Sequence, residues 1–250
     1  MRLLGKIFSK KEEILPALDM SIFKVDMHSH LIPGIDDGSK TMSQTIGLLS
    51  KLEEMGYKKV ITTPHIMRDY YQNTPDIILN GLAELKNELA TLNLNIQVEA
   101  AAEYYFDYAF MQQLQQKEKL LTFGDQYILI EFPFHAKPSK IDDLLFELLM
   151  QGYKPVIAHF ERYLYFDDCV SLAQEWRDKG VSIQLNFNSI FGHYGVEVKR
   201  QAERLIDAEA IDFAATDCHN IDHLLILERN STNSYLHKLS HLKLKNNQLI

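Results

Sequence analysis

Two histidines one residue apart stand in residues 25–41, VDMHSHLIPGIDDGSKT, and a pair of aspartates follows them in a glycine-flanked loop. Imidazole and carboxylate groups at this spacing are typical of a metal site. Pro, Gly, Asp and Ser are also ordinary turn formers. A phosphate-binding loop is excluded, because only three residues separate Gly34 from Gly38 and Ser39 precedes Lys40. The segment is therefore either one wall of a metal site or a turn.

Further imidazole and carboxylate side chains recur along the chain, nearly all of them just after an apolar segment. A single histidine near a strand end is more often a hydrogen-bonded structural residue than a ligand. The recurrence, and not any one residue, makes a metal site worth testing. The candidate ligands are His28, His30, Asp37, His65, Glu103, Glu131, His159, Asp217 and His219.

Apolar, β-rich segments provide the strands that would position these groups. Seven of them are predicted, at residues 23–27, 58–63, 95–103, 126–132, 153–160, 181–187 and 211–217. Helical patterns lie between them, including residues 41–55, a helix start at Thr74-Pro75, and two segments that end at Gly152 and Gly180. Strand starts lie 27 to 37 residues apart, the βα repeat length of a parallel sheet closed into a barrel. The sequence predicts one α/β domain over residues 23–250 and an N-terminal extension over residues 1–22.

A barrel of this kind brings all the candidate ligands to one rim, because the carboxyl ends of its strands form the active-site face. In an H-x-H pair the two-residue period of a strand puts both imidazoles on one side, and Asp217 and His219 repeat the pattern. One ion takes four to six ligands, so nine ligands predict two ions, or three if carboxylates bridge. Imidazole and carboxylate ligands suit manganese, iron or zinc.

Other hydrolytic nucleophiles are not supported by the sequence. A cysteine-dependent tyrosine phosphatase needs C-x5-R, but Glu175 and Leu224 stand six residues after Cys169 and Cys218. Neither a G-x-S-x-G nucleophile elbow nor a G-x-G-x-x-G dinucleotide fingerprint occurs. Metal-activated water is the nucleophile that remains. Cys218 is expected to be a small buried hydrophobic residue, and Trp176 to lie in the core.

Two arginines are candidates for binding a substrate oxyanion. Arg68 follows His65 by three residues, and Arg162 follows His159 by the same interval. A guanidinium just beyond the rim can pair with an oxyanion through two hydrogen bonds. The alternative for either residue is a surface ion pair.

Composition limits the class of partner. The chain has 250 residues and a formal net charge of −8, which argues against a broad nucleic-acid-binding surface. Two cysteines and the lack of a membrane-spanning apolar run favour a cytoplasmic protein. The start, MRLLGKIFSKKEEI, is basic and mildly amphipathic, so contact with the inner face of the membrane is a further expectation. Homo-oligomerisation is left open.

Residues 25–220 carry six motifs in order: DMHSHLIPGIDDGS, TTPH, AAEYY, YILIEFPF, GYKPVIAHFERY and ATDCHN. This series resembles the polymerase and histidinol phosphatase (PHP) superfamily, and within it the bacterial tyrosine phosphatases encoded with capsule and exopolysaccharide genes. The resemblance implies a distorted (β/α)7 TIM-like barrel. It also implies three divalent metal ions, often manganese, with iron or zinc as alternatives.

The activity implied by the resemblance is hydrolysis of phosphotyrosine on the tail of a bacterial tyrosine kinase, by a metal-bridging hydroxide that attacks phosphorus. The same nine residues would be the ligands, and Arg162 would bind phosphate. Related members carry an arginine several residues after the final D-x-H-N, where this chain reads HNIDHLL. His223 or Arg68 is therefore the candidate for a second phosphate contact.

Three other functions compete with this one. A small-molecule phosphomonoesterase, such as a histidinol phosphatase, would use the same site, although the aromatic segment EYYFDY favours a peptide substrate. An amidohydrolase-type deaminase or deacetylase needs only one or two ions, so Asp37, Glu131 and His219 would be surplus. A regulator that binds a kinase through a degenerate site is the non-enzyme alternative.

Overall fold

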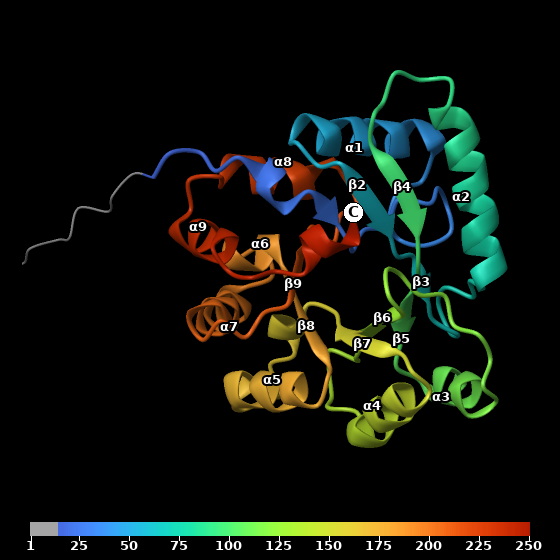
Figure 1. Ribbon diagram of the computed structural model, residues 1–250, viewed down its shortest axis with the longest axis vertical. Helices are drawn as coiled ribbons and strands as arrows, with labels where there is room; N and C mark the ends of the chain where they lie inside the picture. The colour runs from blue at the N-terminus through green and yellow to red at the C-terminus, as the bar shows by residue number, and fades with distance from the viewer. Residues whose placement is uncertain (1–14) are drawn as a thin grey trace, which may run out of the picture.

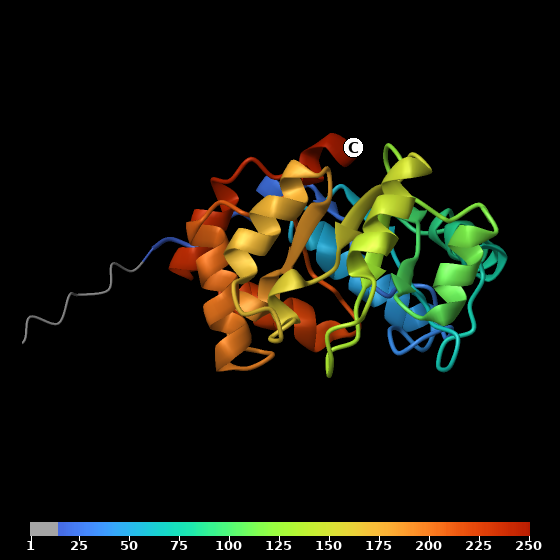
Figure 2. The same cartoon turned by 90° about the horizontal axis from the view of Figure 1, so that it is seen from below.

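A parallel β-sheet that curls upon itself, with helices around its outside, forms the centre of the computed structural model, which describes residues 15–250 (Figures 1 and 2). The basic stretch recognised in the sequence at residues 1–14 lies outside the described residues. The strands are β1 (Val25–Asp26), β2 (Lys59–Thr62), β3 (His65–Ile66), β4 (Gln97–Ala100), β5 (Glu103–Tyr105), β6 (Tyr127–Glu131), β7 (Lys154–Ile157), β8 (Ser182–Asn186) and β9 (Phe213–Ala215).

Helices alternate with these strands along the described chain. The α-helices are α1 (Met42–Glu54), α2 (Pro75–Leu89), α3 (Tyr108–Gln115), α4 (Ile141–Met150), α5 (Cys169–Asp178), α6 (Phe187–Ile190), α7 (Val196–Asp207), α8 (Ile221–Arg229) and α9 (Ser234–Ser240). Three short 3-10 helices are η1 (Met20–Phe23), η2 (Phe160–Arg162) and η3 (Asn246–Leu249). No described helix combines the length and apolar character needed to cross a membrane.

The sheet has two sections with the strand orders β1-β2-β4 and β3-β5-β6-β7-β8-β9, and every pairing is parallel. The two sections share one register, because the offset that pairs Thr62 with Ala100 also pairs His65 with Glu103. The predicted strands at residues 58–63 and 95–103 therefore begin as β2 and β4, and after a short break the chain continues as β3 and β5. All seven predicted segments contain strand, so the mixed α/β fold with a curled parallel sheet is confirmed.

The first and last strands lie side by side where the sheet curls. Just beyond the ends of β1 and β9, the Asp217 N–H donates to the His28 carbonyl at 2.9 Å, and the His30 N–H donates to the Cys218 carbonyl at 2.9 Å. Ser29 and Cys218 form a parallel bridge between these bonds. The residues that follow β1 are thereby fixed next to the residues that follow β9.

Local sequence explains the helix boundaries. The Thr41 side chain accepts a hydrogen bond from the Gln44 N–H at the start of α1, and Thr74 precedes Pro75 at the start of α2. Gly152 and Gly180, which follow α4 and α5, have φ values of +85° and +94°. A left-handed residue ends a helix at little cost when it is glycine, so the predicted helix ends are confirmed.

Apolar residues pack on both faces of the sheet. One cluster, which includes Met27, Leu129 and Phe213, is formed largely by strand residues, and a larger cluster lies between the sheet and the helices. Trp176 is 2 % exposed and belongs to the larger cluster, as does Cys218. The expectation that both are core residues is confirmed.

Part of the predicted N-terminal extension packs on the rest of the molecule. Met20 and Phe23, in η1, are buried in the larger apolar cluster. The Leu18 N–H donates to the Ser231 carbonyl, between α8 and α9, at 2.9 Å. Residues 18–23 are therefore bound to the C-terminal helices.

The side chain of Asn246 joins the first strand, β1, to the last strand, β9, through hydrogen bonds, and this link can be tested by mutation. The Asn246 side chain is buried, and its Nδ2 donates to the carbonyls of Val25 and Ala214 at 2.9 and 2.7 Å, while its Oδ1 accepts from the Ala214 N–H. Asn246→Ala leaves these backbone groups unpaired, so it should lower the free energy of unfolding by about 1–3 kcal/mol in urea titrations. The neighbouring Asn247→Ala removes one exposed hydrogen bond to Ile22 and should cost less than about 1 kcal/mol. Equal losses would contradict the assignment.

Candidate metal centre

All nine candidate ligands converge at the carboxyl ends of the strands. They form four overlapping groups, within each of which the ligand atoms lie no more than 4.8 Å apart. The groups are His30, Asp37, His65 and His219; His28, His30 and Glu103; His28, His159 and Asp217; and His65, Glu103 and Glu131. The cavity above them has a volume of about 360 Å³. The rim predicted from sequence therefore brings these residue types together.

Strand geometry explains how distant residues reach the cluster. Glu103 begins β5, Glu131 ends β6, and His159 and Asp217 each stand two residues beyond a strand. His159 and Asp217 have φ values of 33° and 49°, in the left-handed region that residues other than glycine seldom adopt. Backbone strain of this kind costs about 1–3 kcal/mol and persists where surrounding contacts enforce it. Here the contacts are the Gln184 side chain, which accepts from the His159 N–H, and the His28 carbonyl, which accepts from the Asp217 N–H.

Three of the imidazoles, those of His28, His30 and His219, present their Nε2 atoms to the cluster, whereas His65 faces Glu103 through its Nδ1 at 3.1 Å. The Nδ1–H of His28 donates to Gln184 Oε1 at 3.0 Å, that of His30 to Asp36 Oδ2 at 2.8 Å, and that of His219 to the Asp217 carbonyl at 2.9 Å. The Nε2 atoms of His28 and His30 lie 3.4 Å apart. A neutral imidazole held in this way has a lone pair on Nε2, and two facing lone pairs require a cation or a proton between them.

Charges in the cluster also fit a cation. Burial, together with the negative charge of Glu103, raises the pKa of Glu131 well above its usual range. Burial and the charge of Arg162 lower the pKa of His159 to about 4, so its imidazole is neutral at neutral pH. Glu103 Oε2 and Asp217 Oδ1 are buried without hydrogen-bond partners in the described residues. Buried carboxylates and neutral imidazoles without partners are the donor set that a divalent transition metal prefers.

Burial opposes protonation of His28 and His30, but nearby carboxylates outweigh it and raise the pKa of both imidazoles. Protons on these two imidazoles would compete with a metal ion for the same nitrogen atoms. Because a ligating histidine must give up that proton, metal binding to this cluster should release protons.

A set of buried polar residues behind the ligands was not predicted from the sequence. Asp36 Oδ2 accepts from the His30 imidazole and from the His65 N–H at 3.1 Å, and its Oδ1 accepts from the Gly38 N–H at 3.0 Å. Only glycine fits at position 38, because a Cβ there would lie 2.1 Å from the His30 carbonyl oxygen. Asp37, not Asp36, lies in the group of candidate ligands.

Gln184 and Asn186 form a second part of this support. Gln184 Nε2 donates to Asn186 Oδ1 at 2.8 Å, and Asn186 Nδ2 donates to Asp217 Oδ2 at 2.7 Å. Both residues lie in β8, whose sequence SIQLN alternates them with Ile183 and Leu185. Polar residues alternating with apolar ones in a fully buried strand were the signal that could have identified them.

Arg162 lies at the edge of the cluster's cavity. Its guanidinium carbon is 4.2 Å from the centre of the Phe134 ring and 4.4 Å from that of Tyr194, and its Nη1 is 3.5 Å from Asp217 Oδ2. The two rings hold the guanidinium plane beside the candidate ligands. His223 lines the same cavity, and its ring is 5.2 Å from that of His193.

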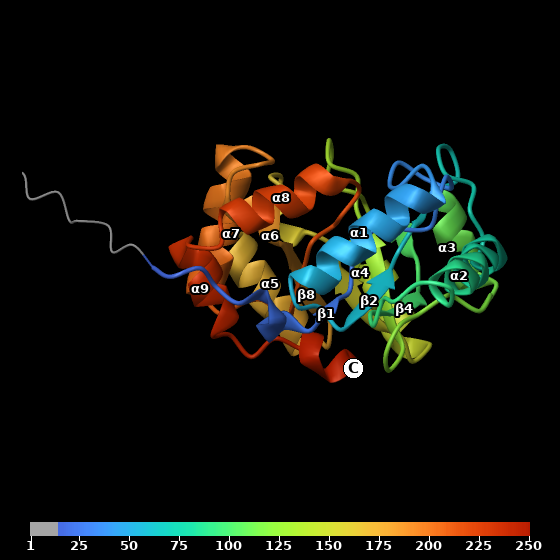
Figure 3. The same cartoon turned by 90° about the horizontal axis from the view of Figure 1, so that it is seen from above.

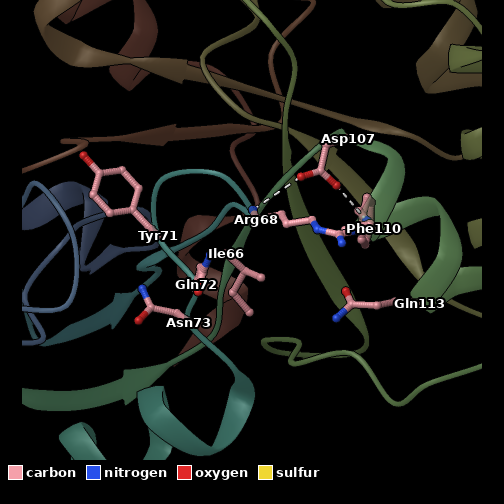
Figure 4. Close-up of a pocket in the computed structure, with 9 residues that line it drawn as sticks. Ile66, Arg68, Tyr71, Gln72, Asn73, Asp107, Phe110 and Gln113 are labelled. Carbon is pink, nitrogen blue, oxygen red and sulfur yellow. Dashed lines mark hydrogen bonds between the residues drawn. The ribbon is translucent and has the colours of Figure 1, made fainter.

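Arg68 is not brought into this cavity. It lines a neighbouring hollow of about 370 Å³ with Tyr71, Asp107 and Gln113, and Figure 4 shows its side chain extending toward α3. Its backbone N–H donates to Asp107 Oδ2 at 3.4 Å. Tyr71 separates the hollow from the cluster, because its ring stacks on the ring of His65 with 5.3 Å between centres.

Comparison with known families gives a match over most of the chain. Residues 24–226 match the family described as "Capsular polysaccharide synthesis, CpsB/CapC". The tyrosine-protein phosphatase YwqE of Bacillus subtilis is 32% identical over 198 residues, which are 79% of this chain and 78% of that protein. The putative tyrosine-protein phosphatase CapC of Staphylococcus aureus is 29% identical, over 79% of this chain and 77% of that protein.

A solved structure is also similar. It comes from a study of YwqE from Bacillus subtilis and CpsB from Streptococcus pneumoniae, described as unique metal-dependent tyrosine phosphatases. The superposition has a TM-score of 0.74 at 28% identity and covers 90% of this chain and 93% of the other.

Asp36 offers a test of how the imidazoles are positioned. Asp36→Asn replaces an acceptor of the His30 and His65 N–H groups with a side chain that can present only one acceptor oxygen. Loss of such a contact behind a ligand typically weakens metal affinity about 10- to 100-fold. Competition titration with a chelator should measure this loss. Asp125→Asn, which removes only an exposed partner of Lys154, should leave metal affinity unchanged, and equal affinities in the two variants would refute the role of Asp36.

Proposed function

The chain belongs to the capsular polysaccharide synthesis CpsB/CapC family, and from this premise we propose that it is a metal-dependent protein-tyrosine phosphatase. The observation that carries the proposal is the convergence of nine imidazole and carboxylate side chains in one cluster, beneath a cavity that seven of them and Arg162 line. The relatives named above as tyrosine-protein phosphatases support the reaction class. The substrate is a phosphotyrosine protein, in our proposal a bacterial tyrosine kinase that controls capsule or exopolysaccharide synthesis.

The proposed catalytic unit is residues 23–250, folded as a distorted (β/α)7 barrel of the PHP type, with residues 1–22 as an extension. Parallel pairing throughout the sheet and the backbone bonds between His28 and Asp217 support this fold. We assign the protein to the cytoplasm, where its two buried cysteines would stay reduced.

The nine residues would hold up to three divalent ions, which we propose to be manganese, with iron or zinc as alternatives. His30, Asp37, His65 and His219 would bind one ion; His28, His159 and Asp217 a second; and Glu103 and Glu131, with His65, a third. When bound, the ions would activate water for attack on phosphorus and offset the negative charge of the phosphoryl group.

The chain's own contribution to the reaction is positioning and charge. Arg162, held between two aromatic rings, would pair with the non-bridging oxygens of the phosphoryl group. Its contact with Asp217 fixes the guanidinium relative to the ligands. Asp36, Gln184 and Asn186 keep those ligands in place, so little rearrangement is needed as the phosphate enters. His223, which lines the cavity, is the second candidate for an oxyanion contact, and Arg68 would have to reach the phosphate from its neighbouring hollow.

The test of this function is turnover of three substrates by the purified protein: a phosphotyrosine peptide, a phosphoserine peptide and histidinol phosphate. We expect the phosphotyrosine peptide to be preferred, two or three transition-metal ions per chain by elemental analysis, and loss of activity after chelation that added manganese restores. Heat-denatured protein with the same metals is the control.

Two results would contradict the proposal in different ways. A preference for histidinol phosphate would assign the site to a small phosphomonoester. Fully active protein with at most one ion per chain would overturn the three-ion centre and leave the substrate class standing.

Arg162→Ala should keep the metals and the fold and lose turnover. A contact that strengthens in the transition state typically contributes about 2.7–4 kcal/mol, a loss of roughly a hundred- to a thousandfold in kcat. Arg162→Lys keeps the charge without the planar fork and should restore part of the rate. Steady-state kinetics with an aryl phosphate measures both.

Arg68→Ala is the matched comparison, since its guanidinium lines a different hollow. It should reduce aryl phosphate turnover much less than Arg162→Ala does. Equal losses would instead make Arg68 the second phosphate contact, and an Arg162→Ala variant within a few-fold of the parent would remove Arg162 from the proposed chemistry.

A further inference from the structure

A further hollow, distinct from the one that Arg68 lines, adjoins the metal-centre cavity. It lies between α1 and the start of α8, two helices that run side by side in Figure 3 and contact one another. Its volume is about 480 Å³. Asp37, His219 and Asn220 line both this hollow and the metal-centre cavity, so the two adjoin at these residues. We call it the α1–α8 groove.

The lining of the α1–α8 groove combines apolar surface with free amide donors. Leu48 and Ile221 supply apolar surface, and Ile221 is 44% exposed. Gln44 and Asn220 accept hydrogen bonds through their side-chain oxygens, from the Lys40 and Asp222 N–H groups. Their NH₂ groups have no acceptor among residues 15–250. Apolar walls with a few well-placed polar groups are typical of a binding site.

Gly47 lines the α1–α8 groove and adds no side chain to it. It stands in the interior of α1, where glycine costs roughly 0.5–1 kcal/mol relative to alanine. No described atom lies within 4 Å of a Cβ built at this position. Lack of space therefore does not explain why position 47 is glycine. Position 38 differs, because a Cβ built there would collide with His30. A side chain at position 47 would instead occupy the groove.

We propose that the α1–α8 groove binds an apolar side chain next to the phosphotyrosine of the substrate, while the NH₂ groups of Gln44 and Asn220 bind the peptide backbone. This inference rests on the proposed function. A polypeptide whose phosphate lies at the metal centre has to leave the cavity across its rim, and the groove opens at Asp37 and His219 on that rim. A peptide fits both kinds of lining, because its backbone carbonyls accept from amides and its side chain fills the apolar part.

Gly47→Leu tests the proposal without disturbing the metal centre. We expect kcat/KM for a phosphotyrosine peptide with an apolar neighbouring residue to fall about tenfold or more. Turnover of para-nitrophenyl phosphate should stay within twofold, since that substrate does not extend into the groove. Gly47→Ala should give a smaller loss with the peptide. Glu84→Leu, on the exposed side of α2, is the control for adding leucine to a helix surface, and it should behave like the parent with both substrates.

The substrate supplies the second half of the test. Peptides with leucine or glycine on either side of the phosphotyrosine should differ in kcat/KM with the parent protein and much less with Gly47→Leu. Such coupling between a groove residue and a substrate residue is the mark of direct contact. Ile221→Ala, which trims the opposite wall, should also reduce the difference between the leucine and glycine peptides, and it serves if Gly47→Leu fails to fold.

Three outcomes would overturn the groove assignment. An equal loss with para-nitrophenyl phosphate would mean that position 47 acts through the metal centre. Unchanged peptide kinetics would remove the groove from the substrate's path. A different mass in solution for Gly47→Leu would make the groove a contact between copies of the chain. Failure of the proposed function is distinguishable from all three, because the parent protein itself would then not hydrolyse phosphotyrosine.

Discussion

One buried carboxylate, Glu103, organises the rest of the site. Its two oxygens face four imidazoles, with distances of 3.2 Å to His28, 3.4 Å to His30, 3.1 Å to His65 and 3.1 Å to His159. Burial alone would raise the pKa of Glu103, but the neighbouring imidazoles hold it well below its usual range. An ionised carboxylate inside a protein is tolerated only when it is paired and hydrogen-bonded. The strands must therefore bring imidazoles to Glu103 from several directions.

The curled sheet meets that demand because parallel strands end at a common edge. His65 pairs with Glu103 across β3 and β5, and the chain after β1 is bonded to the chain after β9. The left-handed backbone at His159 and Asp217 then turns the His159 imidazole toward Glu103 and the Asp217 carboxylate toward His28. Strain and buried charge reduce stability, and the extensive apolar packing on both faces of the sheet offsets them. A site of this kind depends on the fold as a whole, since no two of its ligand-bearing strands are joined by a tight hairpin.

Sequence alone could place most of the candidate ligands because their positions follow from two simple periods. The βα repeat fixes which residues follow strands, and the two-residue alternation fixes which side of a strand they face. The choice of Asp37 over Asp36 as a candidate ligand does not follow from these periods, since both are aspartates in one loop, and it rests on the family resemblance. Only the fold shows that Asp36 turns inward to the His30 imidazole while Asp37 faces His65 and His219.

The two arginines illustrate the same limit more sharply. Each follows a histidine of the cluster by three residues, yet only Arg162 reaches the cavity. After His159 the chain forms η2, and the hydrogen bond from the Arg162 N–H to the His159 carbonyl folds Arg162 back over the ligands. After His65 the chain forms a turn closed by hydrogen bonds between Met67 and Tyr71, which carries Arg68 outward toward α3. The two arginines are equally far from their histidines in sequence but point to different hollows, because the turns that follow the histidines differ. Neither turn contains a glycine or proline that would have indicated its type from the sequence.

The charge balance of the cavity makes any phosphate binding depend on a cation. The chain has a formal net charge of −8, and Asp37, Glu103 and Asp217 all have their pKa values lowered, so they carry negative charge in the cluster. Arg162 is the one arginine or lysine that lines the described part of this cavity. Arg162 already faces Asp217, and the raised pKa values of His28 and His30 reflect pairing with the same carboxylates. Little positive charge is therefore left to offset the repulsion between these carboxylates and a phosphate dianion. Divalent ions would reverse the sign of the local field. If the cluster binds metal ions as proposed, phosphate affinity in this cavity should therefore rise with metal occupancy.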